Sequence, residues 1–385
     1  MELYVHIPFC TRKCGYCAFV SFTGCDQPKM EQYVDMLLRE ASQRKKIVTE
    51  PIETVYIGGG TPSLLPPELT DRLLTGLADV FSFSNVTEFT VEANPGTVTD
   101  EWLVTTARCG VSRVSFGMQS DQDHLLKTLG RIHRLSDVIR SVKSARRAGF
   151  HNISLDLMFG IPGQTDDDWR QTLETAVLLS PEHISAYGLI PEEGTPLFRD
   201  LSNGILSLPD PELERDMYDT AITILNKAGF HQYELSNFSR PGYACRHNIG
   251  YWDQIPYLGI GISAASMIRF PLSDPSAFSL RWTNPYTFKE YYNLISHPEQ
   301  LDKLQETVSQ KEARFETVML SLRMNSGMRR SRFRELHGQE PEYWYGDLLE
   351  RFRELGLITL IDDSWRLTRQ GMDIQNSLLV EFMDD

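Results

Sequence analysis

The chain has 385 residues, a net charge of −14 and six cysteines. Its length predicts one large domain and a smaller one, and its acidic balance argues against nucleic acid as the main partner. No signal peptide precedes the first strand, no apolar run approaches the roughly 20 residues of a membrane span, and the cysteines after residue 17 are scattered, so we expect a cytoplasmic protein with at most peripheral membrane contact.

Apolar stretches rich in β-formers alternate with helical segments over the first 200 residues. We expect strands at residues 3–7, 54–60, 88–95, 113–119, 153–160 and 183–190. Gly110, Gly149 and Gly229 each have the position of a residue that ends a helix before such a stretch, and the helix that ends at Gly149 is expected to have Ser136 as its N-cap. Strands that alternate with helices predict a parallel sheet in a partial or full α/β barrel, with a doubly wound sheet as the alternative.

Three of the six cysteines lie within eight residues, in the stretch CTRKCGYC at residues 10–17. A C-x2-C pair alone is compatible with a redox pair or half of a zinc site, but C-x3-C-x2-C offers three thiolates and no obvious fourth. A structural zinc site completed by His6 or by a distant ligand is the alternative. Three protein ligands would leave an open position on the bound group.

The predicted strands end in polar residues or glycines that are unusual for a core. These residues are Gly58, Gly59, Gly60 and Thr61, then Glu92 and Asn94, then Gln119, then Asp156. In an α/β barrel the reacting groups gather at the C-terminal ends of the strands. The alternative is that the glycines make tight turns and the carboxylates cap the following helices.

The last part of the chain has a different pattern. Residues 310–385 predict three helices and a hairpin around Asp362, Asp363 and Ser364, which is a winged-helix-like outline. A basic run at Arg329, Arg330, Arg332 and Arg334 would suit DNA, but nearby acidic residues favour a domain that closes one end of the barrel. We expect a barrel core at 1–235, a linking segment at 236–309 with residues 271–288 as loop, and the small domain at 310–385.

Several of these segments together resemble the radical SAM superfamily, in the branch that holds oxygen-independent coproporphyrinogen III oxidase and the heme chaperone HemW. They are YVHIPFCTRKCGYCAF, GGGTP, EANP, SFGMQS, GRIHR and DLMFGIPGQT. The resemblance runs almost from end to end of the chain. It implies that Cys10, Cys14 and Cys17 bind three irons of a 4Fe-4S cluster, and that the fourth iron is open to the amino and carboxylate groups of S-adenosyl-L-methionine (SAM).

The resemblance also implies a set of side chains and backbone groups that bind SAM. Glycine leaves room for the methionine part, Glu92 suits ribose hydroxyls, and Arg131 offers a fork to a carboxylate. The implied cofactor-binding residues are Tyr4, Tyr16, Gly59, Gly60, Thr61, Glu92, Gln119, Arg131 and Asp156.

The two members of this branch differ in function, and three features bear on the choice. Phe19 stands where the oxidase type carries an additional cysteine, and the N-terminal extension that helps to enclose the oxidase's substrate is expected to be absent. CRHNIGYW at residues 245–252 resembles the H-N-x-x-Y-W motif of the chaperone branch, with His247 in the position associated with heme and Cys245 as a competing ligand. Ala265 departs from the branch, because relatives commonly have histidine there.

We therefore expect a chaperone that binds a 4Fe-4S cluster, SAM and heme, and that delivers heme to acceptor hemoproteins, with respiratory membrane enzymes as one class of acceptor. Coproporphyrinogen III oxidation is the second hypothesis, and a zinc-stabilised barrel module without enzymatic activity is the third. No nucleic-acid partner and no catalytic side chain are expected.

Overall fold

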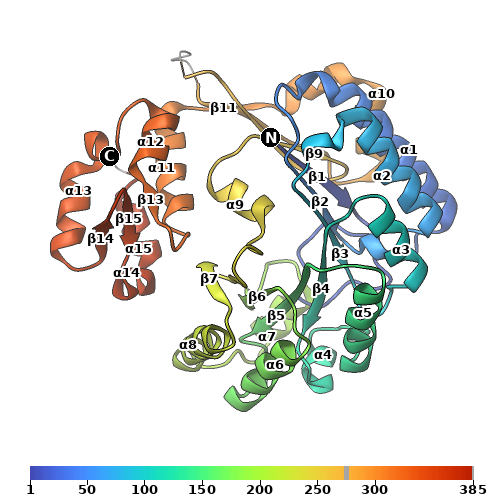
Figure 1. Ribbon diagram of the computed structural model, residues 1–385, viewed down its shortest axis with the longest axis horizontal. Helices are drawn as coiled ribbons and strands as arrows, with labels where there is room; N and C mark the ends of the chain where they lie inside the picture. Colours follow the sequence, from blue (N-terminus) through green and yellow to red (C-terminus); the bar gives the residue numbers. More distant parts are fainter. Residues whose placement is uncertain (273–276, 384–385) are drawn as a thin grey trace.

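The computed structural model describes residues 1–272 and 277–383, and its main feature is a curved, twelve-stranded sheet (Figure 1). The strand order is β12-β11-β10-β9-β1-β2-β3-β4-β5-β6-β8-β7, parallel from β9 to β6 and antiparallel at both ends. The strands are β1 Glu2–Ile7, β2 Thr54–Gly59, β3 Glu88–Ala93, β4 Arg113–Gln119, β5 Ile153–Phe159, β6 His183–Gly188, β7 His231–Glu234, β8 Asn237–Ser239, β9 Tyr257–Ile260, β10 Ala265–Arg269, β11 Ser279–Thr283 and β12 Glu306–Val308.

The helices that connect the parallel strands cover the outer side of this sheet, whereas α9 lies on its inner side (Figure 1). Their bounds are α1 Gln27–Arg44, α2 Pro67–Phe81, α3 Asp100–Arg108, α4 Asp123–Thr128, α5 Leu135–Arg147, α6 Asp166–Leu178, α7 Pro196–Ser202, α8 Pro211–Lys227, α9 Arg246–Trp252 and α10 Phe288–Ser296. Short 3-10 turns lie at Lys45–Ile47, Pro62–Leu64, Phe83–Asn85 and Pro298–Leu304.

The six predicted strands are confirmed as β1 to β6, to within two residues at each end. They follow one another in chain order across the sheet, so the order reversal that defines a doubly wound sheet is not found between them. This is the sheet of a partial α/β barrel, as the sequence predicts.

Two local predictions are wrong. The helix before Gly149 begins at Leu135 rather than after Ser136, because Asp137 accepts a hydrogen bond from the backbone of Arg134 (2.9 Å) and fixes the start two residues earlier. The segment predicted as loop at 271–288 contains β11, which pairs with both β10 and β12 and extends the large sheet. Residues 273–276 of that segment lie outside the described residues.

The C-terminal elements form a separate layer with their own core. They are α11 Gln310–Ser321, β13 Met328–Arg329, α12 Arg330–His337, α13 Glu342–Glu354, β14 Ile358–Ile361, β15 Ser364–Leu367, α14 Arg369–Asp373 and α15 Gln375–Glu381. Val318, Phe333, Phe352 and Trp365 are buried together in this core. The predicted three helices and hairpin are confirmed, and α14 and α15 are additional.

The basic run of this small domain is paired within the chain. Carboxylates lie 2.5–3.2 Å from its four arginines, in the pairs Arg329–Asp253, Arg330–Glu340, Arg332–Glu335 and Arg334–Glu340. The first pair joins the end of β13 to Asp253, the residue that follows α9. This pairing favours a domain that packs on the barrel.

Candidate functional site

The C-terminal ends of the parallel strands surround a cavity of about 360 Å³. It is lined by all three cysteines of the N-terminal loop and by every predicted cofactor-binding residue except Tyr4. The lining residues among the predicted set are Cys10, Cys14, Cys17, Tyr16, Gly59, Gly60, Thr61, Glu92, Gln119, Arg131 and Asp156. The fold therefore brings together side chains from six stretches of sequence.

The cysteine loop leaves the end of β1 and is tied back to it. Cys10 N donates to Phe22 O (3.0 Å), and Phe22 N donates to Pro8 O (2.7 Å), so the two ends of the loop pair like short strands. The Phe22 ring packs on Phe288 of α10 with centroids 4.6 Å apart. In the middle of the loop, Gly15 N donates to the carbonyl of Leu129 at 3.0 Å. The loop is thus held at its base and at its tip.

The surroundings of the three thiols suit a 4Fe-4S cluster. Arg131 Nη1 lies 3.6 Å from Cys14 Sγ, and the Nε of Arg131 is buried with no hydrogen-bond partner among the described residues. A cluster held by three thiolates is negatively charged, so this guanidinium is a matching cation. Each thiolate of such a cluster binds its own iron, so the three thiols need not converge on one point. In the described part of the chain, no three His, Cys, Asp or Glu side chains converge in a way that would hold a single metal ion.

A glycine turn at the end of β2 lies against the base of the cysteine loop. Gly59 has φ +110°, and a Cβ there would lie 2.4 Å from the His6 ring. A Cβ on Gly60 would lie 2.7 Å from the carbonyl oxygen of Phe9. Both contacts are too close for any side chain, which explains why the turn needs glycine.

Two half-buried carboxyl groups, those of Glu92 and Asp156, face the same cavity. Glu92 accepts hydrogen bonds from the Tyr56 hydroxyl (2.9 Å) and from Gly59 N (3.0 Å). Burial raises the pKa of Glu92 to about 7, and repulsion from Asp156 adds to this. Burial also raises the pKa of Asp156, although Ser115 donates a hydrogen bond to it at 3.1 Å. The oxygens of these carboxyl groups can accept hydrogen bonds from the hydroxyl groups of a ligand.

Gln119 and Arg113 are two further features of β4. Gln119 ends the strand with φ +62°, at a shift in the register between β4 and β5. A positive φ on a residue other than glycine is a strain often found at functional sites. Arg113 lines the cavity and is only 2% exposed. It was not predicted, although an arginine that opens an otherwise apolar strand is a visible signal.

A second hollow of about 560 Å³ adjoins the first, between the inner face of the sheet and α11. Its walls are mainly aromatic and apolar, and include Tyr4, Phe19, Ala265, Tyr251, Trp252, Tyr257, Met267 and Met319. A smaller hollow of about 200 Å³ connects the two. Phe19, whose side chain is 67% exposed, lines all three. Tyr4 lines this second hollow and the connecting one, but not the cysteine cavity. Its hydroxyl lies 3.0 Å from His6 Nδ1.

His247 lies in the connecting hollow and is 1% exposed. Its Nδ1 is 2.7 Å from Thr54 Oγ1, its Nε2 is 3.1 Å from the Tyr251 hydroxyl, and its ring stacks on Tyr56. Burial, together with the positive charge of Arg113, lowers the pKa of His247 to about 3, so the ring is neutral.

Cys245, the competing ligand in the sequence, is fully buried. It donates to Glu88 Oε1 at 3.4 Å, and burial raises the pKa of its thiol to about 12. The residue is absent from the linings of the hollows described above. A role in binding iron is therefore less accessible to Cys245 than to His247.

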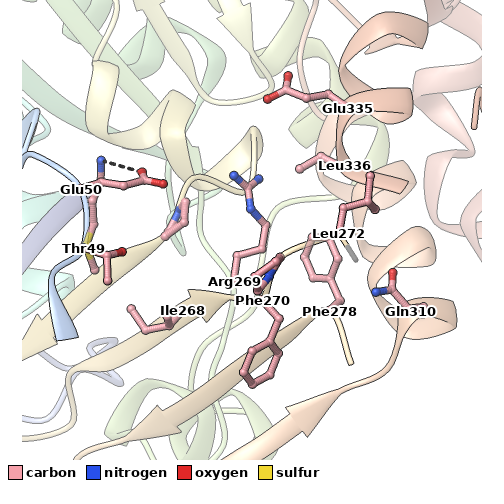
Figure 2. Close-up of a pocket in the computed structure, with 13 residues that line it drawn as sticks. Thr49, Glu50, Ile268, Arg269, Phe270, Leu272, Phe278, Gln310, Glu335 and Leu336 are labelled. Atoms are coloured by element: carbon pink, nitrogen blue, oxygen red, sulfur yellow. Dashed lines mark ion pairs between the residues drawn. The ribbon is translucent and has the colours of Figure 1, made fainter. Parts of the chain in front are cut away.

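Another cavity, of about 370 Å³, lies at the opposite ends of the strands, beside the start of β1 and of β9. Figure 2 shows Arg269 and the apolar side chains of Ile268, Phe278 and Leu336 among its walls. None of the predicted site residues lines it. The candidate site is the group of hollows at the C-terminal strand ends.

The curved parallel sheet, with a three-cysteine loop after its first strand, defines the class of radical SAM proteins. The family model described as Radical SAM superfamily matches residues 4–176, and the model described as HemN C-terminal domain matches residues 308–374. The chain is 35% identical over 384 residues to the heme chaperone HemW of Bacillus subtilis (strain 168), with 99% of each chain covered. It is 34% identical over 387 residues to the heme chaperone HemW of Escherichia coli (strain K12), with 100% of this chain and 98% of the relative covered.

Among solved structures, coproporphyrinogen III oxidase (HemN) from Escherichia coli is similar, with a TM-score of 0.82 and 23% identity over 99% of this chain and 89% of that chain. This likeness shows the fold. Within the radical SAM superfamily, the chain belongs to the HemW family.

Proposed function

We propose that this chain is a HemW-like heme chaperone that binds heme and delivers it to acceptor hemoproteins. The observation that carries this proposal is the identity of 34–35% to two proteins named heme chaperone HemW over nearly the whole chain. The chaperone works in the cytoplasm, where reducing conditions keep thiols available for a cluster. In the described residues, no helix combines the length and the apolar character needed to cross a membrane.

In this proposal, Cys10, Cys14 and Cys17 hold a 4Fe-4S cluster, and SAM binds in the adjoining cavity of about 360 Å³. When bound, the cluster and SAM supply electron-transfer chemistry. The chain itself positions these groups: the glycine turn admits the ligand to the backbone, Arg131 balances the negative charge, and Glu92 accepts hydrogen bonds from hydroxyl groups.

The heme then occupies the hollow of about 560 Å³. Its aromatic walls suit a flat, apolar macrocycle, and two of them, Tyr251 and Trp252, come from the HNIGYW motif. His247, four residues before Tyr251, lies behind this wall and is the proposed iron ligand. Imidazole is a common axial ligand of heme iron.

Titration of purified protein with ferric heme tests this function, because the visible absorption band of heme shifts when the protein binds it. We expect the wild-type protein to bind heme and His247→Ala to bind it at least about tenfold more weakly, a loss of about 1.4 kcal/mol. His231→Ala is the matched control, because His231 is exposed on β7 and should leave binding unchanged.

The same protein, reconstituted with iron and sulfide and supplied with SAM and a reductant, should not convert coproporphyrinogen III to protoporphyrinogen. Robust decarboxylation of the propionates would contradict the chaperone function and support the oxidase. The Phe19 side chain, in the position of the oxidase's additional cysteine, is the reason to expect none.

A further inference from the structure

The hydrogen bonds around His247 favour the tautomer that carries its hydrogen on Nδ1. Thr54 donates its hydroxyl hydrogen to Glu2 Oε1 at 3.2 Å, so the Thr54 oxygen is left to accept from His247 Nδ1 at 2.7 Å. Because a neutral imidazole has one N–H, Nε2 then carries the lone pair and accepts from the Tyr251 hydroxyl at 3.1 Å. Nε2 is thus in the form that binds iron, but its lone pair is occupied.

Tyr251 also stands between His247 and the large hollow. It is four residues after His247 on α9, and such pairs lie on one face of a helix. Tyr251 lines both the connecting hollow and the hollow of about 560 Å³, whereas His247 lines only the former. The Tyr251 ring meets His247 edge-on at 4.9 Å and Tyr257 at 4.8 Å, so it fills the space between them.

We propose that Tyr251 is a gate over the heme ligand: its hydroxyl caps Nε2 of His247 in the heme-free protein, and heme binding exchanges that hydrogen bond for a bond from Nε2 to iron. This inference rests on the proposed function. The exchange breaks one hydrogen bond and forms one bond from the nitrogen lone pair to the metal. No proton leaves, because Nε2 carries none and Tyr251 keeps its own.

The Thr54 and Glu2 contacts stay in place during this exchange and hold the imidazole in one orientation, as partners behind a metal-binding histidine commonly do. The gate also favours release. When an acceptor draws heme away, the Tyr251 hydroxyl competes with iron for the same lone pair. This competition lowers the affinity for heme while His247 is kept as the iron ligand. A lower affinity favours transfer of heme to an acceptor.

Tyr251→Phe tests the gate because it removes the hydroxyl and keeps the ring. The variant no longer has to break the hydrogen bond, so we expect ferric heme to bind about twofold to tenfold tighter than to the wild-type protein. Transfer of heme to excess apomyoglobin should be slower by a similar factor. Structural damage would have the opposite sign, because a disturbed cavity binds heme more weakly.

Tyr343→Phe is the matched control, since it makes the same change at an exposed position of α13 that lines none of the three hollows. It should leave affinity and transfer rate unchanged. In the double variant His247→Ala with Tyr251→Phe, the gain should be absent relative to His247→Ala alone. A Tyr251→Phe protein that binds heme no tighter than wild type, or a gain that persists without His247, would overturn the gate and leave the chaperone function standing. A wild-type protein that binds no heme would overturn both.

Discussion

Gly60 shows how a single missing side chain positions the candidate site. The turn after β2 carries Gly59, Gly60 and Thr61 into the cavity, and it crosses the base of the cysteine loop. A Cβ on Gly60 would lie 2.7 Å from the carbonyl oxygen of Phe9 and 2.9 Å from that of Ile7. These are backbone atoms, so they cannot rotate away as a side chain would. The turn and the loop can approach each other only if this residue is glycine.

We expect Gly60→Ala to destabilise the protein by about 1–3 kcal/mol, because overpacking against backbone forces the two segments apart. The displaced cysteine loop should also take up less iron on reconstitution. Thermal unfolding of the apoprotein and iron content per chain measure the two effects. Gly346→Ala is the control: a Cβ there meets nothing within 4 Å, and the residue follows a kink at Tyr345 in α13, so the same change should not destabilise the protein. Equal effects of the two substitutions would contradict the steric argument.

The hydrogen-bond partners of the site residues cannot be predicted from the sequence. The pattern of cysteines, glycines and polar strand ends predicted the members of the first cavity, because parallel strands place their C-terminal ends together. His247 could be named from its motif, but its partner Thr54 is 193 residues away in the chain. Whether a histidine is free or capped depends on such distant contacts, which leave no local pattern.

Among the secondary-structure elements, sequence patterns predict the strands that are long apolar runs. They miss a strand whose conformation depends on pairing with its neighbours. The β1 to β6 strands are largely buried on both faces and are recognisable as apolar runs. β11 is short, and its residues 280–281 and 283 are only half-buried, so it lacks such a run. Its strand conformation comes from the ladders to β10 and β12, which a single stretch of sequence does not reveal.

The contact between the barrel and the C-terminal layer also depends on a distant pair. Arg323, just after α11, lies 2.8 Å from Glu234 of β7, and its guanidinium lies over the Trp252 ring at 4.5 Å. The Glu234 side chain is fully buried, whereas that of Arg323 is 30% exposed. Asn325 N continues the contact with a hydrogen bond to Tyr233 O at 3.0 Å. The arginine therefore joins β7, α9 and the small domain.

We expect Arg323→Met to destabilise the protein by about 2–3 kcal/mol, because it leaves the Glu234 carboxylate buried without its cation; the partial exposure of Arg323 keeps the loss below that of a fully buried pair. Arg147→Met removes the partner of Asp100, in a pair whose side chains are 63% and 70% exposed, and should cost far less because water screens this pair. Chemical denaturation of both variants at one pH compares them. If both variants lose the same free energy of unfolding, burial of Glu234 does not account for the contribution of the Arg323–Glu234 pair.

For the molecule as a whole, the large hollow exists only because two layers meet. Tyr4 and Met267 come from the sheet, Tyr251 and Trp252 from α9, and Met319 from α11 of the small domain. Figure 1 shows α9 between the sheet and the C-terminal elements. No segment of the sequence contains this cavity, so the fold class was predictable while the proposed place of the heme was not. A heme in it would contact both layers at once.

Met319→Glu tests whether the small domain forms one wall of the heme site. A carboxylate facing an apolar macrocycle must lose much of its hydration, so heme affinity should fall at least about tenfold, or about 1.4 kcal/mol. The iron-sulfur absorbance of the reconstituted protein should be unchanged, because Met319 does not line the cysteine cavity. Lys311→Glu introduces the same side chain at an exposed position in the first turn of α11, where negative charge is compatible with the helix dipole, and should leave heme binding intact. Unchanged heme affinity in Met319→Glu would mean that heme binds the barrel alone and that α11 is no part of the site.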